Sequence, residues 1–187
     1  MLTDELRSVT SNITTSVGKT LGSMGVTANQ ITFLVLITGL VSAYLITQGY
    51  FYCAILLFLF SGILDGLDGA VAKANNKETK FGGLFDSTTD KTTEIMVYIA
   101  LGIYNPDFWL PASLAIAFFM LSSYISKHAK ASGGKSGGGI MERKERMILL
   151  ILGMFFMDYM IYSLYAIAIL SIVTAIQRFY KNYQLLK

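Results

Sequence analysis

Residues 65–90 of this 187-residue chain read DGLDGAVAKANNKETKFGGLFDSTTD, a polar segment between two apolar stretches. The segment carries four aspartates, namely Asp65, Asp68, Asp86 and Asp90. A carboxylate in or near a bilayer is costly unless it finds a cation, a polar partner or water, so such a group marks a functional site by default. The sequence therefore predicts a functional site here, and four carboxylates suit the binding of divalent metal best.

The composition indicates a membrane protein. Hydrophobic residues make up 53% of the chain and charged residues 14%, with a mean hydropathy of +0.54, whereas a soluble domain carries about 25% charged residues. A spanning helix needs about 20 mostly apolar residues. Six stretches are predicted to cross the bilayer: 31–47, 51–72, 84–104, 108–126, 146–157 and 158–180. The fifth is short and continues almost directly into the sixth.

The predicted fold is an all-α integral membrane protein with a single domain over residues 1–187. Residues 31–180 are expected to form a bundle of six transmembrane helices. Residues 1–25 are expected to form a cytoplasmic juxtamembrane amphipathic helix, because their apolar residues recur at helical spacing. A polar leader packed loosely on the bundle is the alternative for that first segment.

Basic residues gather on one side of the predicted membrane. With six spans, the N-terminus, residues 73–80, residues 127–146 and the C-terminus share that side and, with the adjacent span ends, hold all 15 Lys and Arg. The positive-inside rule makes it the cytoplasmic side of a multi-pass cell-membrane protein, with both termini and the aspartate segment on it. The net charge of +3 then reflects topology and anionic lipid, and no nucleic-acid partner is expected.

The spacing of the aspartates places them in pairs. Asp65 and Asp68 are three apart, and Asp86 and Asp90 are four apart, so each pair lies on one helical face. Two antiparallel helices joined by a short loop bring those faces together. Carboxylates without a cysteine or histidine cluster favour Mg²⁺ or Mn²⁺ over zinc. Two such ions can clamp both oxygens of a phosphoryl transfer, so two ions are predicted.

The segment resembles the signature of the CDP-alcohol phosphotransferase family, DxxDGxxARx8GxxxDxxxD. Every fixed position matches except Lys73, which stands where the family usually has arginine. Lysine keeps the charge but lacks the planar, bidentate contact of a guanidinium. The run VTANQIT at 26–32 also resembles the start of the first span in many members. The resemblance implies a six-span bundle, a cytoplasmic site and a homodimer.

The resemblance also implies a reaction and roles for residues. Members transfer a phosphatidyl-type group from a CDP-activated lipid, CDP-diacylglycerol or CDP-archaeol, to an alcohol and release CMP. Asp65, Asp68 and Asp86 would ligate metal, while Asp90 would ligate metal or take the proton of the acceptor hydroxyl. The residues that would bind the CDP-lipid are Gly66, Gly69, Ala72, Lys73 and Gly82.

The acceptor is predicted from a second basic cluster. Its members are Lys127, His128, Lys130, Arg143 and Arg146. A phosphorylated acceptor uses such charge better than a neutral one. The run GIMERKERMILL at 139–150 also resembles the GxxERxER run of members that use inositol 1-phosphate, the synthases of phosphatidylinositol phosphate and archaetidylinositol phosphate. Inositol 1-phosphate is therefore the predicted acceptor.

Several alternatives stay open at this point. Ser126 and His128 stand where those relatives tend to have arginine, so glycerol 3-phosphate, serine or another alcohol remains a candidate acceptor. Arg143 and Arg146 can instead be lipid anchors, and a lone histidine at an interface is more often a polar anchor. A cation transporter is the remote alternative for the whole chain. The glycine-rich run SGGKSGGG at 132–139 is expected to form a mobile loop.

Overall fold

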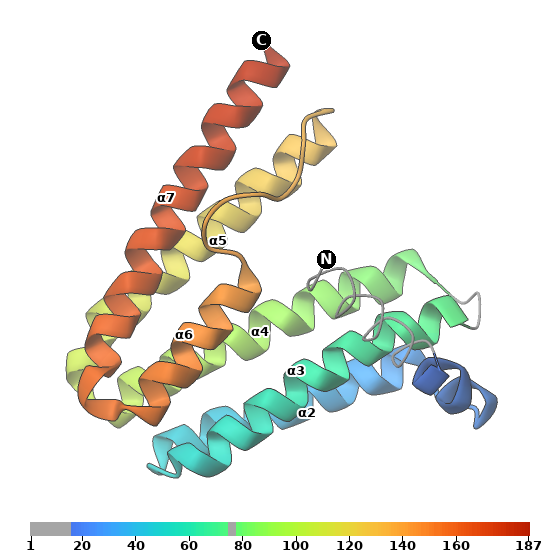
Figure 1. Ribbon diagram of the computed structural model, residues 1–187, viewed down its shortest axis with the longest axis horizontal. Helices are drawn as coiled ribbons and strands as arrows, with labels where there is room; N and C mark the ends of the chain where they lie inside the picture. Colours follow the sequence, from blue (N-terminus) through green and yellow to red (C-terminus); the bar gives the residue numbers. More distant parts are fainter. Residues whose placement is uncertain (1–15, 75–77) are drawn as a thin grey trace, which may run out of the picture. The chain divides into compact units, whose positions relative to one another are not determined.

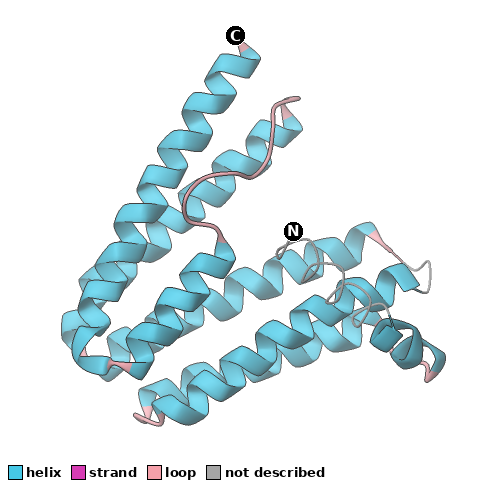
Figure 2. Cartoon of the chain, viewed as in Figure 1, coloured by secondary structure: helices cyan, strands magenta, loops and turns pink. Residues whose placement is uncertain are grey.

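The computed structural model of the protein describes residues 16–74 and 78–187. Within these residues the structure is helical and contains no strand (Figure 2). A short helix at 16–23 precedes the labelled elements of Figure 1. Their bounds are α2 Ala28–Thr47, α3 Phe51–Ala74, α4 Lys80–Tyr104, η1 Pro106–Phe108, α5 Trp109–Ala131, α6 Arg143–Phe155, η2 Met157–Tyr159 and α7 Met160–Leu186.

The all-helical prediction is confirmed, but the count of six spans is not. Four segments are long and apolar enough to cross a membrane: Ala28–Thr47, Phe51–Lys73, Pro106–Ala131 and Met157–Leu186. Helix α4 begins with a polar, charged half. Helix α6 has 13 residues, or about 20 Å, which is shorter than a hydrocarbon core of about 30 Å. The chain is thus a multi-pass membrane protein in which α4 and α6, two of the six predicted spans, are less apolar or shorter than the other four.

The predicted juxtamembrane helix lies mostly outside the described residues. Of residues 1–25, the structure describes 16–25, and 16–23 are helical. A Cβ atom added at Gly18 would lie 2.9 Å from the backbone of Ala70 in α3. The described turn therefore packs directly against a helix of the bundle.

The chain divides into two compact units, and the first contains the aspartate segment. Of the residues that the structure describes, it takes those up to Leu45 together with those within Leu56–Val97. The Ser61 hydroxyl donates a hydrogen bond to the Val35 carbonyl, 3.2 Å away, and so ties α3 to α2. A Cβ added at Gly39 of α2 would lie 2.5 Å from the methyl group of Thr93 in α4. Three helices therefore pack tightly around the position from which the aspartates project.

The second unit takes Ile46–Ile55 and Tyr98–Lys187. Helix α7 packs against both α5 and α6, and α5 and α7 run side by side in Figure 1. The rings of Tyr98 and Phe119, both fully buried, stack 5.8 Å apart. This unit carries the basic residues predicted to bind the acceptor.

Candidate functional site: an aspartate cluster and a basic loop region

Three of the four predicted metal ligands come together. Asp65 and Asp68 on α3 and Asp86 on α4 each offer a carboxylate oxygen, and these oxygens lie within 4.8 Å of one another. Asp68 is buried, while Asp65 and Asp86 are half-buried. Like charges this close repel unless a cation lies between them. The donor set of carboxylate oxygens alone fits a hard divalent cation.

The cluster has one fixed member. Both oxygens of Asp68 accept hydrogen bonds, Oδ2 from the Thr32 hydroxyl at 2.7 Å and Oδ1 from the Gly69 backbone amide at 2.5 Å. Thr32 itself is buried on α2. Sequence reasoning did not assign Thr32 a role, although it ends the VTANQIT run that resembles other members. The two bonds hold the carboxylate in one orientation, as a ligand site requires.

Asp90 is not part of this three-carboxylate group. It lies one helical turn beyond Asp86 on α4, and its residue is half-buried. Its predicted roles, metal ligand or base, stay predictions.

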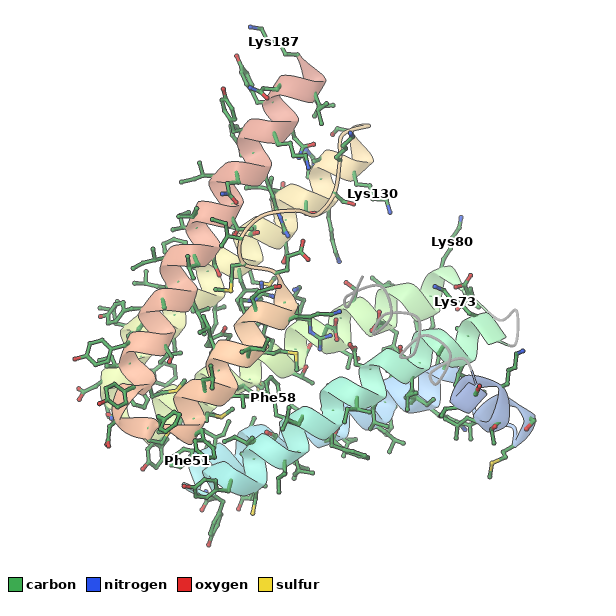
Figure 3. The ribbon with its side chains drawn as sticks, viewed as in Figure 1. Phe51, Phe58, Lys73, Lys80, Lys130 and Lys187 are labelled. Atoms are coloured by element: carbon green, nitrogen blue, oxygen red, sulfur yellow. The ribbon has the colours of Figure 1, made fainter. Side chains whose placement is uncertain are left out.

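A hollow of about 200 Å³ opens beside the cluster, and we call it the aspartate hollow. Asp68 and Asp86 both line it. Of the residues predicted to bind CDP-lipid, those that line it are Gly69, Ala72 and Gly82. Gly66 and Lys73 are not among the lining residues. Lys73 is instead exposed in the last turn of α3, as Figure 3 shows.

The start of α4 shapes one wall of this hollow. The Thr79 hydroxyl accepts a hydrogen bond from the Gly82 amide at 2.9 Å, which is the bond of a helix N-cap. A Cβ added at Gly82 would lie 3.0 Å from that hydroxyl oxygen and 3.4 Å from Asn29 Oδ1. Asn29 and Thr79 also line the hollow, and sequence reasoning assigned neither of them to the site.

The basic residues at the end of α5 differ in their surroundings. Lys127 and Lys130 are exposed, and Figure 3 shows Lys130 near the end of its helix. His128 stacks on the ring of Tyr124, with centroids 5.7 Å apart, and lines a mainly apolar hollow of about 450 Å³. His128 is itself exposed, and its predicted contact with the acceptor stays a prediction.

The two predicted arginines lie in the first turns of α6. Glu142 and Glu145 form a capping box there, which fixes the start of the helix at Arg143. Arg146 is only 4% exposed, and its guanidinium carbon lies 4.8 Å from the centre of the Phe119 ring. Arg146 therefore does not match the alternative of an exposed lipid anchor. Its predicted contact with the acceptor stays a prediction.

Comparison with known proteins identifies the family. The sequence profile described as CDP-alcohol phosphatidyltransferase matches residues 25–177. This chain belongs to the CDP-alcohol phosphatidyltransferase family. The prediction from the aspartate signature is thereby confirmed.

Two of the similar proteins are synthases of inositol phosphate lipids. The archaetidylinositol phosphate synthase of Pyrococcus horikoshii is 36% identical over 142 residues, 75% of each chain. The phosphatidylinositol phosphate synthase of Mycobacteroides abscessus is 33% identical over 116 residues, 59% of this chain and 52% of that one.

Two crystal structures of the phosphatidylinositol phosphate synthase of Mycobacterium tuberculosis have the same fold. The structure with CDP-DAG bound has a TM-score of 0.83 at 26% identity and covers 92% of this chain and 94% of that one. The structure in complex with manganese and citrate has a TM-score of 0.82 at 25% identity and covers 91% and 88%.

Membership settles the class of the protein. This phosphatidyltransferase is a membrane enzyme of phospholipid biosynthesis that depends on divalent metal, as the aspartate cluster independently indicates. The prediction of an enzyme is confirmed, and the alternative of a cation transporter is wrong.

The structure of this phosphatidyltransferase adds one cation that sequence reasoning missed. Arg178 lies in α7, where its Nε donates to the Gly138 carbonyl at 2.7 Å and its Nη1 donates to the Ser122 carbonyl at 3.1 Å. Its Nη2 lies 3.7 Å from Glu142 Oε1. The available signal was an arginine two residues before the end of the predicted final span at 158–180. Its partners are far away in the sequence, so the pattern gave no role.

Proposed function

We propose that this enzyme transfers a phosphatidyl or archaetidyl group from a CDP-activated lipid to inositol 1-phosphate and releases CMP. The observation that carries the proposal is the convergence of Asp65, Asp68 and Asp86 beside the aspartate hollow. Family membership supplies the reaction class. The donor is CDP-diacylglycerol or CDP-archaeol, which share the CDP head group that this site would hold.

The acceptor is inferred from two lines of support. One is the names of the similar proteins, which are synthases of archaetidylinositol phosphate and phosphatidylinositol phosphate. The other is the cation set of the second unit, in which Arg146 is buried and Arg143 opens α6. A phosphate group on the acceptor accounts for the placement of so much positive charge.

The residue roles follow from the chemistry of the donor. Asp65, Asp68 and Asp86 hold one or two ions, Mg²⁺ or Mn²⁺, and Asp90 completes the set or acts as base. Bound divalent ions supply positive charge to a pyrophosphate and to a leaving phosphate. Asp90 as base takes the proton from the acceptor hydroxyl while the new bond from oxygen to the lipid-side phosphorus forms and the bond to CMP breaks.

The small residues of the aspartate hollow allow the donor to come close to the helix backbone. Gly69, Ala72 and Gly82 would line the CDP head group, with Gly66 nearby on α3. Lys73, exposed at the end of that helix, would neutralise a phosphate oxygen.

The membrane arrangement in this proposal has six spans, both termini in the cytoplasm and a homodimer. The sole cysteine offers a direct test of orientation, because Cys53 is exposed and precedes most of α3 on the predicted outer side. A membrane-impermeant maleimide should label Cys53 in intact cells. A cysteine placed at Ser136 in a Cys53→Ala background should react only after permeabilisation. The reverse pattern would invert the orientation.

The test of the reaction uses the purified enzyme in liposomes with a CDP-activated lipid and Mg²⁺ or Mn²⁺. Inositol 1-phosphate, glycerol 3-phosphate, serine and free inositol compete as acceptors, and both CMP and the lipid product are measured. Inositol 1-phosphate should give the highest kcat/KM. A higher value for any other acceptor would refute the acceptor assignment but not the reaction class.

A further inference from the structure

Three side chains on one face of α7 hold the loop between α5 and α6, and we call them the α7 clasp. They are Thr174, Arg178 and Asn182, spaced four apart and hence aligned along the helix. Each contacts a different point of the loop at residues 132–142. The contacts fall at Lys135, Gly138 and Met141.

The bonds of the α7 clasp go to the loop backbone. Asn182 makes two of them to one residue, because its Oδ1 accepts from the Lys135 amide at 2.9 Å and its Nδ2 donates to the Lys135 carbonyl at 3.1 Å. The Thr174 hydroxyl accepts from the Met141 amide at 2.9 Å. Thr174 is 0% exposed, and its bond to the Met141 amide is shielded from water. Asn182 is 5% exposed, but Lys135 is exposed, so the two bonds between them are only partly shielded. A shielded backbone amide that loses its partner costs free energy, which makes the Thr174 bond hard to give up.

The glycines of the loop fit the α7 clasp closely. A Cβ added at Gly134 would lie 2.5 Å from Asn182 Oδ1, and one added at Gly139 would collide with the Thr174 side chain. Gly139 also has a φ of 124°, which side chains rarely adopt. Gly139 therefore allows a backbone conformation that other residues rarely adopt, and both glycines allow the loop to lie close to α7. The loop that the sequence predicts to be mobile therefore makes specific contacts with α7 in the structure.

The same contacts reach the beginning of α6. Glu142, which belongs to the capping box of α6, accepts a hydrogen bond from the Gly138 amide at 3.0 Å. Its Oε1 also lies 3.7 Å from Arg178. Gly137, one residue earlier in the loop, donates from its amide to the Ser126 hydroxyl at 2.8 Å. The α7 clasp thus fixes the loop between the end of α5 and the first turn of α6.

We infer that Thr174, Arg178 and Asn182 are positioning residues that hold the loop and the start of α6 in one arrangement, so that the acceptor phosphate meets preformed cations there. The role in binding the acceptor phosphate rests on the proposed function, whereas the contacts of the α7 clasp with the loop do not. A binding wall that is ordered before the ligand arrives avoids the entropy cost of ordering it afterwards. A loosened α7 clasp should therefore weaken acceptor binding and leave donor binding unchanged.

The experiment compares Thr174→Val with Thr174→Ser, because valine keeps the size but removes the acceptor for the Met141 amide, whereas serine keeps the hydroxyl. Asn182→Ala is the second disrupting variant, and Ser136→Ala changes the same loop at a position outside the α7 clasp. Limited trypsin digestion of the folded enzyme, followed by mass spectrometry, measures cleavage after Lys135. Steady-state kinetics measure KM for the acceptor and for the CDP-lipid.

Loss of one or two of these hydrogen bonds corresponds to about a tenfold change in the opening equilibrium. Thr174→Val and Asn182→Ala should therefore speed cleavage after Lys135 about tenfold and raise the acceptor KM by a similar factor. The CDP-lipid KM and kcat should stay near wild type, and Thr174→Ser and Ser136→Ala should resemble wild type in both measurements.

Each other outcome overturns a defined part of the inference. Unchanged cleavage in both disrupting variants would show that the α7 clasp does not hold the loop. Faster cleavage with an unchanged acceptor KM would show that it holds the loop but does not position the acceptor. If the wild-type enzyme prefers another acceptor, the proposed acceptor is wrong. The KM of the α7 clasp variants is then measured for that other acceptor, and the cleavage after Lys135 tests the clasp in either case.

Discussion

Two glycine-rich segments of this enzyme each contain a pair of glycines, and the two pairs are packed in opposite ways. Around the aspartates, a Cβ added at Gly69 or Gly83 would meet nothing within 4 Å beyond its chain neighbours and the backbone of its own helix, and both residues line the aspartate hollow. In the α5–α6 loop, a Cβ added at Gly134 or Gly139 would run into the α7 clasp. Gly69 and Gly83 leave open space in the aspartate hollow, whereas Gly134 and Gly139 leave room for side chains of α7. Composition alone does not distinguish these two uses.

The largest expected effect tests whether the first segment is a metal site. Asp68→Asn removes the charge of the fixed carboxylate, and CMP release should fall by roughly 10³-fold, because a lost ion costs several kcal/mol of transition-state stabilisation. Binding of Mn²⁺, followed by electron paramagnetic resonance, should weaken in parallel. Asp107→Asn, which alters an exposed aspartate of the second unit, is the matched control and should leave both unchanged. Full activity of Asp68→Asn would refute the hypothesis that Asp68 belongs to a metal site required for the reaction.

Asp90→Asn separates the two roles of that residue. As a base, Asp90 should contribute roughly 10²-fold or more to turnover, while Mn²⁺ affinity stays the same because Asp90 lies outside the three-carboxylate group. Single-turnover CMP release and a metal titration measure the two quantities. A parallel loss of metal affinity would make Asp90 a ligand instead.

Gly69→Ala and Gly134→Ala put the comparison of the two segments to a direct test. In Gly69→Ala the methyl group meets nothing within 4 Å beyond its chain neighbours and its own helix backbone, so the helix should gain about 0.5–1 kcal/mol of stability. The same methyl group takes up space in the aspartate hollow, so the CDP-lipid KM should rise while the acceptor KM stays constant. Thermal unfolding and kinetics with each substrate varied check this pair of effects.

Gly134→Ala should give the opposite pattern. Its methyl group would lie 2.5 Å from Asn182 Oδ1 and 3.0 Å from the Ala129 carbonyl, and such overpacking costs about 1–3 kcal/mol. The acceptor KM should rise and the CDP-lipid KM should not. If both glycine variants affect the same substrate, the division of labour between the two segments is wrong.

The smallest effect concerns the ion pair of Arg178 and Glu142. The side chain of Glu142 is 52% exposed and that of Arg178 is 11% exposed, so solvent screens much of the attraction and the coupling energy should be only about 0.5 kcal/mol. A double-mutant cycle of Arg178→Gln and Glu142→Gln, read by thermal unfolding, measures that coupling. A coupling energy of several kcal/mol would show that charge, rather than hydrogen bonding to the backbone, holds the α7 clasp.

Sequence reasoning predicted well wherever the information is local. The spacing of Asp65 and Asp68 places them on one helical face, and a short connection to α4 brings Asp86 to them. The apolar stretches likewise correspond to helices α2 to α7. The sequence predicted less well how deeply a side chain is buried and which residues surround it. Arg146 was predicted to belong to a basic cluster that binds the acceptor, with a lipid anchor as the alternative, and it is buried over Phe119.

The sequence by itself determined the membrane class, the helical segments and the metal-binding signature, because hydropathy and helical periodicity act over a few neighbouring residues. Only the tertiary structure decided which side chains support the site. Thr32 reaches Asp68 across 36 positions, and Asn182 reaches Lys135 across 47. Such bonds depend on how helices pack, and no local pattern records which distant backbone group a threonine or an asparagine will meet.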